Sequence, residues 1–347
     1  MTSLPTKGLA VEAFLLRDGH TGVERYILNL IGALSENGTC QVTVFILTGC
    51  NFTFSPPNPC LHFKRIPVKT RVLRILFQHF AFPFWLQGYK KVFFTGYLGS
   101  LLFPAKKTAI AVFDLIALER PELVKRSTRW YYSLLLPWFI RKADILFVPS
   151  EKTRIGISQM NPIGSIVKVP IPIDDAFYED QNAPTAYSIT DRKAILVVGF
   201  GEKKKNHALL RQISPCFPEI DFWLVGKSEA REQFPENVHQ FGFVLQAQLV
   251  RMFRQADVLG FLSFEEGYGL PIYEALVSGT PVLTWKTAPF TEIHSPLLYH
   301  PISPDLQSYI QSLKHILLAP KPSTRTPFQL IRWSEYWSTI ELELLRA

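Results

Sequence analysis

Short apolar runs alternate with helical periodicities along this chain of 347 residues, and the alternation occurs twice. The first series begins with LAVEAFLL and an amphipathic segment from about Gly22 to Glu36, and continues through VTVFIL, KVFFT, TAIAVFD and ILFVPS. The second runs from AILVVGF through DFWLVG and VLGFLS to PVLTW. Strands that alternate with helices favour parallel, doubly wound sheets, so the sequence predicts an α/β fold with two such sheets.

A segment of different composition separates the two series. After KVPIPID, the stretch DDAFYEDQNAPTAYSITDR is rich in acidic residues, Pro and Asn and lacks apolar periodicity. The chain exceeds the size at which a single hydrophobic core stops growing, and 47% hydrophobic residues suffice for two cores. We therefore expect domains at 1–172 and 193–325, a linker at 173–192 and a final helix within 326–347.

The segment that most restricts the function is 263–281, SFEEGYGLPIYEALVSGTP. Gly267 and Gly269 allow backbone N–H groups to approach a ligand closely, and Pro271 suits the first position of a helix. The N-terminus of that helix favours an anion such as a pyrophosphate. Glu266 lies before the helix and Glu274 within it, so the two carboxylates can bind hydroxyls on different parts of one ligand. The alternative is an ordinary Gly-Pro turn with two solvated glutamates.

Two further segments are candidates for binding phosphate. In VVGFGEKKKN, at 197–206, a predicted strand ends in glycines and three lysines before a helix capped by Asn206. In DGHTGVERYILNL, a turn that ends at Gly22 precedes an amphipathic helix. The alternatives are a solvated run of lysines and a glycine needed only for the dihedral angles of a helix start.

These segments together resemble the retaining glycosyltransferases of family 4, the group 1 transferases with a GT-B fold. Residues 266–274 resemble the family's E-x7-E signature, and 197–206 resemble its VGR-x4-KN segment. The resemblance implies two Rossmann-like domains that face each other across a cleft, with the final helix returning to the first domain.

The resemblance also implies roles for individual residues. Glu266 would contact the donor sugar and Glu274 the nucleotide ribose, while Lys205 would neutralise the leaving diphosphate. The remaining donor-binding positions implied by the family are Gly22, Val244, Gly267, Tyr268, Gly269 and Leu270, of which Gly22, Gly269 and Leu270 face the diphosphate and Val244 lies near the base.

Two positions depart from the family pattern. Phe113, in AIAVFDLIALERPE, stands where the family has a histidine near the reacting sugar, and Phe200 stands where it has an arginine. Asp114 is then the best remaining polar group beside that position and is predicted to be catalytic, together with Glu266 and Lys205. A structural role, with the Asp114 carboxylate capping the following turn, is the alternative. Lys203 or Lys204 could substitute for the arginine.

The resemblance implies transfer of a hexose from a UDP- or GDP-sugar to a hydroxyl acceptor, a glycan or a lipid-linked molecule, with retention of configuration. No cofactor or metal is expected. The sequence has no Asp-x-Asp and no H-x-x-H spacing, so lysines and helix amides would carry the phosphate charge. The alternative, suggested by Phe113 and Phe200, is a catalytically reduced partner subunit that binds nucleotide sugar without efficient transfer.

Charge is distributed unevenly along the chain. Residues 1–170 contain 21 Lys+Arg and 9 Asp+Glu, whereas residues 171–347 contain 16 and 20. The segments 64–86 and 120–142 combine cations with aromatic residues, as docking onto an anionic membrane would require. The alternative places these aromatics in the core. No nucleic-acid partner is expected, because no recognition motif appears and the second half is acidic.

The compartment is predicted from the cysteines and the hydropathy. Four cysteines without C-x-x-C spacing indicate free thiols in a reducing environment. LAVEAFLL is better explained as a strand than as a signal peptide, and no apolar stretch reaches the roughly 18 residues that span a bilayer. We expect a cytoplasmic protein, either free or peripheral on the inner face of the cell membrane.

Overall fold

The computed structural model describes residues 7–18, 21–37, 41–52, 58–102, 107–178, 191–199, 203–226, 233–263, 265–319, 328 and 330–346. Phe200 and most of the predicted linker, 179–190, lie outside these residues. The chain forms two compact units. Unit 1 comprises residues 1–118, 126–172 and 331–347, and unit 2 comprises residues 119–125 and 173–330.

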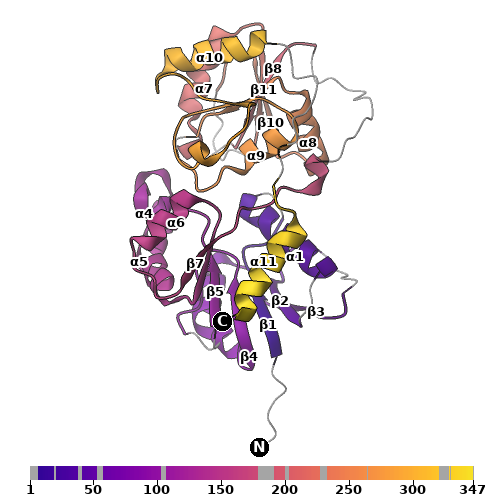
Figure 1. The fold of residues 1–347 in the computed structure, drawn as a ribbon, viewed down its shortest axis with the longest axis vertical. Coiled ribbons are helices and arrows are strands. Elements are labelled where there is room, and N and C mark those ends of the chain that lie inside the picture. The colour runs from indigo at the N-terminus through magenta and orange to yellow at the C-terminus, as the bar shows by residue number, and fades with distance from the viewer. Residues whose placement is uncertain are drawn as a thin grey trace, which may run out of the picture. The chain divides into compact units, whose positions relative to one another are not determined.

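Unit 1 is built on a parallel sheet of seven strands in the order β3-β2-β1-β4-β5-β6-β7 (Figure 1). Strands β2, β5 and β6 are buried along their whole length, as expected for central strands of a parallel sheet. The strands are β1 (Lys7–Glu12), β2 (Val42–Leu47), β3 (Leu61–Ile66), β4 (Tyr89–Phe94), β5 (Lys107–Ala111), β6 (Ile145–Val148) and β7 (Ser165–Lys168).

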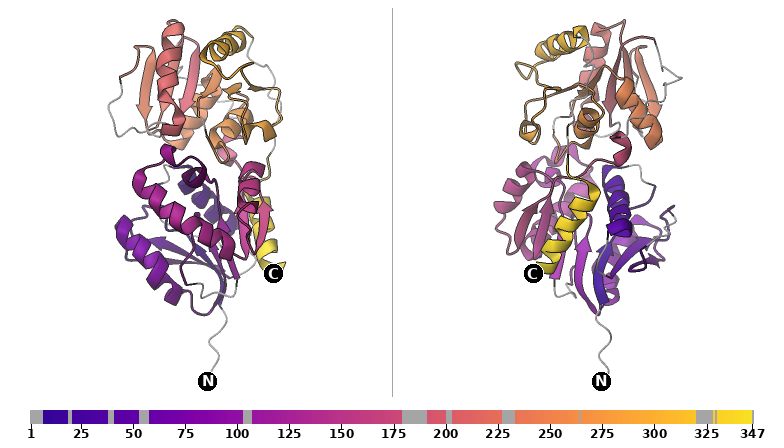
Figure 2. Two further views of the ribbon diagram at one scale, coloured as in Figure 1. Left: turned by 90° about the vertical axis from the view of Figure 1, so that its left-hand side faces the viewer. Right: turned by 45° about the vertical axis from the view of Figure 1, so that its right-hand side comes forward.

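Helices cover both faces of this sheet. The core of one face lies beneath α3 (Phe82–Trp85), α5 (Arg126–Lys142) and α6 (Glu151–Ser158), with Phe82, Phe139 and Ile157 fully buried against strand residues. The other face carries α1 (Gly22–Asn37) and α11 (Trp333–Arg346), which lie side by side (Figure 2, right). Shorter helical segments complete the unit: α2 (Arg71–Leu76), the π-helical turn η1 (Phe77–Ala81) and α4 (Ile116–Glu119), which ends at the border with unit 2.

The C-terminal helix α11 is an integral part of unit 1. Its Tyr336 hydroxyl donates to the Tyr26 hydroxyl of α1 over 3.0 Å, and the ring of Trp333 lies 5.8 Å from that of Tyr26. Lys107 of β5 donates to the carbonyl of Glu343 over 3.3 Å. The end of the chain therefore packs on the unit that its beginning builds.

Unit 2 contains a parallel sheet of six strands in the order β10-β9-β8-β11-β12-β13. The strands are β8 (Ala194–Val198), β9 (Asp221–Val225), β10 (Val238–Gly242), β11 (Val258–Phe261), β12 (Val282–Thr284) and β13 (Leu298–Tyr299). The helices α7 (His207–Ile213) and α10 (Leu306–Leu318) share one core with the sheet, while α8 (Gln246–Gln255) and α9 (Leu270–Val277) pack on its other face (Figure 1). Short 3-10 turns are η2 (Pro121–Leu123), η3 (Asp175–Phe177), η4 (Lys203–Lys205), η5 (Ser214–Cys216) and η6 (Phe290–Glu292).

Three sequence predictions about the chain as a whole can be compared with the structure. The predicted α/β fold with two parallel, Rossmann-like sheets is confirmed. Cys50, Cys60 and Cys216 are free thiols, while Cys40 lies outside the described residues. No helix in the described ranges is long and apolar enough to cross a membrane.

Candidate functional site

The candidate site of unit 2 lies where its strand order reverses. The chain proceeds outward from β8 to β9 and β10 on one side, and from β11 to β12 and β13 on the other. In open α/β sheets, ligands bind beyond the carboxyl ends of the strands at such a switch point. The segments that leave β8 and β11 there are the lysine segment and the glutamate loop, so the topology brings together the two segments selected from the sequence.

Two lysines from the first segment converge on one glutamate of the second. Lys205 Nζ lies 2.7 Å from Glu266 Oε1, and Lys204 Nζ lies 3.2 Å from Glu266 Oε2. Only 17% of the Lys204 side chain, 11% of Lys205 and 10% of Glu266 is exposed. Burial by itself would raise the pKa of Glu266, but the charges and hydrogen bonds of the two lysines lower it to about 2. The carboxylate is therefore ionised at neutral pH.

Gly199 makes the approach of Lys205 possible. It has a φ of +100°, and a Cβ at this position would lie 2.6 Å from Lys205 Cε. Asn206 follows with a φ of 53°, and its side chain accepts a hydrogen bond from Leu209 N to cap α7, as the sequence predicts. Lys205 Nζ also lies 5.2 Å from the centre of the Phe261 ring at the end of β11. The turn after β8 thus holds Lys205 over the end of β11.

The glutamate loop has the helix start that its glycines and proline predict. Gly269 is the N-cap of α9 with a φ of +86°, and Pro271 lies in the first turn. A Cβ at Gly269 would lie 2.8 Å from Phe290 Cε1, so both the dihedral angle and the space favour glycine. Tyr268 is buried and stacks on Tyr273 with 4.3 Å between ring centres. The unpaired backbone N–H groups at the start of α9 and the positive end of its dipole therefore face this loop.

Both signature glutamates are buried, which excludes the alternative of two solvated side chains. Glu266 is 7% exposed and Glu274, on α9, is 3% exposed. Burying a carboxylate costs free energy unless it has charged or hydrogen-bonding partners. Two buried glutamates in one segment therefore indicate a binding role and not a solvated surface.

The turn predicted to bind the nucleotide base, Gly242 to Val244, lies at the end of the edge strand β10, which β9 separates from β8. Gly242 ends the edge strand β10 with a φ of +66°, and its carbonyl accepts from Gly226 N over 2.7 Å. Val244 follows, half-buried, before α8. No contact described for these residues joins Val244 to Glu266 or Lys205, and its role stays a prediction.

In unit 1, the start of α1 carries a feature that the sequence analysis missed. The Thr21 hydroxyl accepts from Glu24 N, and the Glu24 carboxylate accepts from Thr21 N over 2.9 Å, which is a capping box. Glu24 also accepts from the backbone N–H groups of Arg17 and Asp18. The Thr-x-x-Glu spacing from Thr21 to Glu24 could have revealed it. Gly22 begins α1 inside this box, and its predicted contact with a diphosphate stays a prediction.

Asp114 has both of its carboxylate oxygens engaged within unit 1. Oδ2 accepts from the Tyr97 hydroxyl over 2.6 Å, and Oδ1 accepts from Ile116 N over 3.0 Å at the start of α4. This is the geometry of the capping alternative, and the catalytic role stays a prediction. Phe113 is buried between the rings of Tyr26 and Tyr97, at 4.8 and 5.4 Å, and offers no polar group.

The carboxyl ends of β1 and β4, where the strand order of unit 1 reverses, carry a second group that sequence analysis missed. Glu12 is fully buried, and its Oε1 accepts from Phe14 N over 2.8 Å. Burial raises the pKa of Glu12 to about 7, although backbone hydrogen bonds and the charge of Arg74 oppose the shift. A single glutamate within an apolar run gives no sequence signal of such burial.

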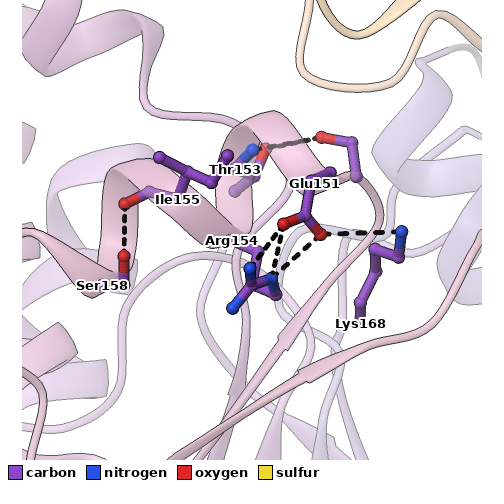
Figure 3. A network of polar contacts seen from close by, with 7 residues as sticks. Glu151, Thr153, Arg154, Ile155, Ser158 and Lys168 are labelled. Carbon is purple, nitrogen blue, oxygen red and sulfur yellow. Dashed lines mark hydrogen bonds and ion pairs between the residues drawn. The ribbon is translucent and has the colours of Figure 1, made fainter. Parts of the chain in front are cut away.

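A second group of ion pairs lies at the start of α6 in unit 1 (Figure 3). Unlike the lysines and glutamate of unit 2, its side chains are partly exposed. Arg154 Nε lies 2.9 Å from each oxygen of Glu151, and Lys168 Nζ lies 3.6 Å from Glu151 Oε2. About a third or more of each side chain is exposed. Exposed pairs of this kind contribute little to stability. The network joins α6 to β7 and presents no buried charge to a ligand.

The family model described as "Glycosyl transferases group 1" matches residues 180–322. Residues 180–322 are a group 1 glycosyltransferase domain. The matched range contains Lys204, Lys205, Glu266 and Glu274, so the prediction of this family is confirmed where the lysine and glutamate segments lie. It does not reach Gly22 or Asp114.

Solved structures of glycosyltransferases share the fold over nearly the whole chain. Sucrose-phosphate synthase from Thermosynechococcus elongatus is 16% identical, with 98% of each chain covered and a TM-score of 0.73. HepE from Anabaena, solved with UDP and glucose, is 12% identical, with 97% of this chain and 95% of that chain covered and a TM-score of 0.66. These likenesses establish the GT-B fold that the sequence resemblance predicts.

A viral protein also matches part of this chain in sequence. "Uncharacterized glycosyltransferase 335" from Sulfolobus islandicus rod-shaped virus 1 is 25% identical over 173 residues, which cover 44% of this chain and 51% of the viral protein. The chain therefore spans about half the length of this curated relative.

Proposed function

We propose that this protein transfers a hexose from a nucleotide-sugar donor to a hydroxyl acceptor with retention of anomeric configuration. The observation that carries the proposal is the convergence of Lys205 and Glu266 at the switch point of unit 2, next to the N-terminus of α9. A cation and a helix N-terminus suit a diphosphate, and buried carboxylates suit sugar hydroxyls. The family match over residues 180–322 supports the same function.

The proposed roles follow the position of each group. Lys205 binds the leaving diphosphate, Glu266 binds hydroxyls of the hexose, and Glu274 binds the ribose. The amides of Gly267, Tyr268, Gly269 and Leu270 complete the diphosphate site, and Val244 flanks the base. We propose a UDP- or GDP-hexose as donor. Two structural neighbours support a nucleotide sugar in general: the HepE structure contains UDP and glucose, and the structure titled "Trehalose-6-phosphate from E. coli" contains UDP-2-fluoro glucose.

We propose that the lysines and helix amides, and not a metal ion or other cofactor, neutralise the diphosphate. Within the described residues, no group of three His, Cys, Asp or Glu side chains could hold a metal. Fixed cations and amides can supply the same charge without a coordination shell.

The reaction proposed for this site is a same-face displacement. The bond between the anomeric carbon and the diphosphate oxygen breaks, and its electron pair stays on the diphosphate. The acceptor oxygen bonds to the anomeric carbon on the same face, and its proton passes to the departing diphosphate. No enzyme nucleophile takes part, so catalysis consists of positioning and charge stabilisation. We retain Asp114 as the proposed polar group near the acceptor hydroxyl, held rigid by Tyr97.

The acceptor is proposed to be lipid-linked, because unit 1 exposes a basic and apolar surface. Two helical segments lie side by side there, 71–85 and α5, joined by a hydrogen bond from Arg71 to Thr128 and by the contact of His79 with Tyr131 (Figure 2, left). We call them the basic-apolar surface. Its exposed large apolar residues are Val72, Leu73, Leu76, Phe80, Phe84, Trp85, Trp130 and Leu134.

The charge of the basic-apolar surface indicates the kind of partner that it binds. Residues 71–85 contain two arginines and α5 contains three arginines and one lysine, and neither segment contains an acidic residue. Apolar side chains flanked by cations suit the interface of an anionic bilayer. We propose that unit 1 docks on the inner face of the cell membrane and there receives a lipid-linked acceptor.

Release of nucleoside diphosphate tests the proposed function. The protein is incubated with UDP-, GDP- and ADP-hexoses, with and without a lipid extract, and the configuration of the product is determined by NMR. We expect one donor to be consumed faster with lipid and the anomeric configuration to be retained. Binding of a donor without any turnover would favour the reduced partner subunit, and inversion would exclude the same-face displacement.

A further inference from the structure

The donor site contains two cationic side chains although the arginine of the family pattern is missing from it. That pattern places one arginine and one lysine by the diphosphate, and in this chain Phe200 occupies the arginine position while Lys205 matches the lysine. The 3-10 turn η4 nevertheless directs a second ammonium group, that of Lys204, to the same carboxylate.

We infer that Lys204 is the second cation of the diphosphate site and performs the task of the missing arginine. This inference rests on the proposed function and assigns a residue that the family pattern leaves out. Lys204 and Lys205 contact different oxygens of Glu266, at 3.2 and 2.7 Å, so their ammonium groups are spaced to bind two oxygens of one small anion. A terminal phosphate presents two oxygens in the same way.

Burial explains why an anion must occupy this place. More than four fifths of each lysine side chain is shielded from solvent, and two ammonium groups held close together repel each other strongly in such surroundings. Glu266 supplies the compensating charge in the structure. The pKa of Glu266 is lowered to about 2 against the effect of burial, and the charge of Lys204 is the largest contribution to the lowering.

The diphosphate of a bound donor can therefore take over part of the contact that Lys204 and Lys205 make with Glu266. When the donor binds, the two ammonium groups contact phosphate oxygens and the carboxylate of Glu266 becomes available to the sugar hydroxyls. As the bond from the anomeric carbon to oxygen breaks, its electron pair adds negative charge to the diphosphate beside both lysines. The acceptor proton then passes to that diphosphate, and neither lysine has to lose a proton.

The test compares nucleotide binding to three lysine variants by calorimetry. The variants are Lys204→Ala, Lys204→Arg and, as a control for loss of one charge, Lys286→Ala, because Lys286 is exposed in the same unit. UDP and UMP are the probes, with GDP and GMP in parallel. We expect Lys204→Ala to weaken UDP binding about tenfold or more and UMP binding much less, because one charge-assisted contact to the second phosphate is lost. Lys204→Arg should restore most of the UDP affinity.

The outcomes separate this inference from the proposed function. If the wild type binds UDP or GDP but Lys204→Ala binds it equally well, Lys204 is not part of the site, while the proposed function stands. Equal weakening of UDP and UMP would also overturn the inference, since it would indicate a general structural effect. If the wild type binds no nucleotide, both fail together.

Glu266→Gln provides an independent check. Removing the negative charge releases both lysines from their partner, so UDP without a sugar should bind more tightly than to the wild type, by about tenfold. Sugar turnover should fall. Weaker or unchanged UDP binding in a variant that remains folded by circular dichroism would contradict the exchange of partners.

Discussion

Lys205 and Glu266 lie 61 positions apart in the sequence, yet their side chains meet at 2.7 Å. The contact arises because β8 and β11 are neighbours in the sheet although β9 and β10 intervene in the chain. The resulting pair is buried and lies at the switch point of the sheet, where a parallel sheet offers a binding position. The functional interpretation of this group 1 glycosyltransferase domain depends on that pairing.

Gly199→Ala should displace Lys205. The added Cβ would lie 2.6 Å from Lys205 Cε, so the lysine side chain must move aside, and a φ of +100° is strained for alanine. Gly242→Ala is the control, because Gly242 also has a positive φ, +66°, but open space around it. We expect the free energy of unfolding to fall by about 2 kcal/mol more for Gly199→Ala than for Gly242→Ala, as measured by urea unfolding. Equal losses of stability in the two variants would mean that the position of Lys205 does not depend on the absence of a side chain at Gly199.

Asp114→Asn should separate capping from catalysis. Asparagine keeps the oxygen that can accept from Ile116 N but loses the charge. If Asp114 acts near the acceptor, kcat should fall about tenfold or more with little change in melting temperature. Tyr97→Phe, which removes the other hydrogen bond to this carboxylate, should affect kcat less. A variant with unchanged kcat would assign Asp114 to capping alone.

Glu12→Gln should change how stability depends on pH. The pKa of Glu12 is raised from 4.5 to about 7 in the folded state. The contribution of this residue to the free energy of unfolding is therefore most favourable below about pH 4.5, and it is lost as the pH rises to 7. Glutamine imitates the protonated form at every pH. The variant should therefore be more stable than the wild type by up to about 3 kcal/mol at pH 8 and equally stable near pH 4.

Glu151→Gln serves as the control for this experiment. The pKa of Glu151 is lowered, chiefly by its hydrogen bond to Arg154, so that its charged form favours folding. This exposed variant should not gain stability at pH 8. A Glu12→Gln variant that behaves in the same way as Glu151→Gln across the pH range would contradict the assigned pKa.

The double variant Trp130→Ser, Leu134→Ser should bind anionic vesicles less tightly. Both side chains are about three quarters exposed, at 76% and 74%, on the basic-apolar surface. We expect about a tenfold or greater loss in cosedimentation with vesicles of phosphatidylglycerol and phosphatidylcholine, since each side chain contributes apolar area to the interface. Leu318→Ser, at an 85% exposed position of unit 2, should bind like the wild type. Failure of the wild-type protein to distinguish anionic from neutral vesicles would refute the docking proposal.

The sequence analysis predicted the elements that depend on local chemistry. The glycine-proline start of α9 and the cap at Asn206 follow from dihedral preferences, and both are present. The alternation of strands and helices was sufficient to predict two parallel sheets. These features need no knowledge of distant residues, which is why one sequence was enough.

Features that depend on contacts between residues far apart in the sequence could not be predicted from the sequence alone. The run of three lysines did not indicate which of them reaches Glu266, because that depends on the path of the turn after β8. The raised pKa of Glu12 results from complete burial among residues of other elements, and no local pattern encodes it. The Thr21–Glu24 capping box was readable from its spacing but was overlooked beside the glycine turn.

The measurement that tests the central claim most directly is calorimetric titration of the wild type and of Glu274→Ala with UDP-, GDP- and ADP-sugars. Glu274→Gln accompanies them, and thermal unfolding verifies that the buried substitutions leave the domain folded. We predict that the wild type binds one class of donor and that Glu274→Ala binds it about tenfold or more weakly, because the contact with the ribose is lost. Absence of binding to every nucleotide sugar, or equal affinity in the wild type and a folded Glu274→Ala, would contradict a donor site built on Glu266, Lys205 and the helix α9.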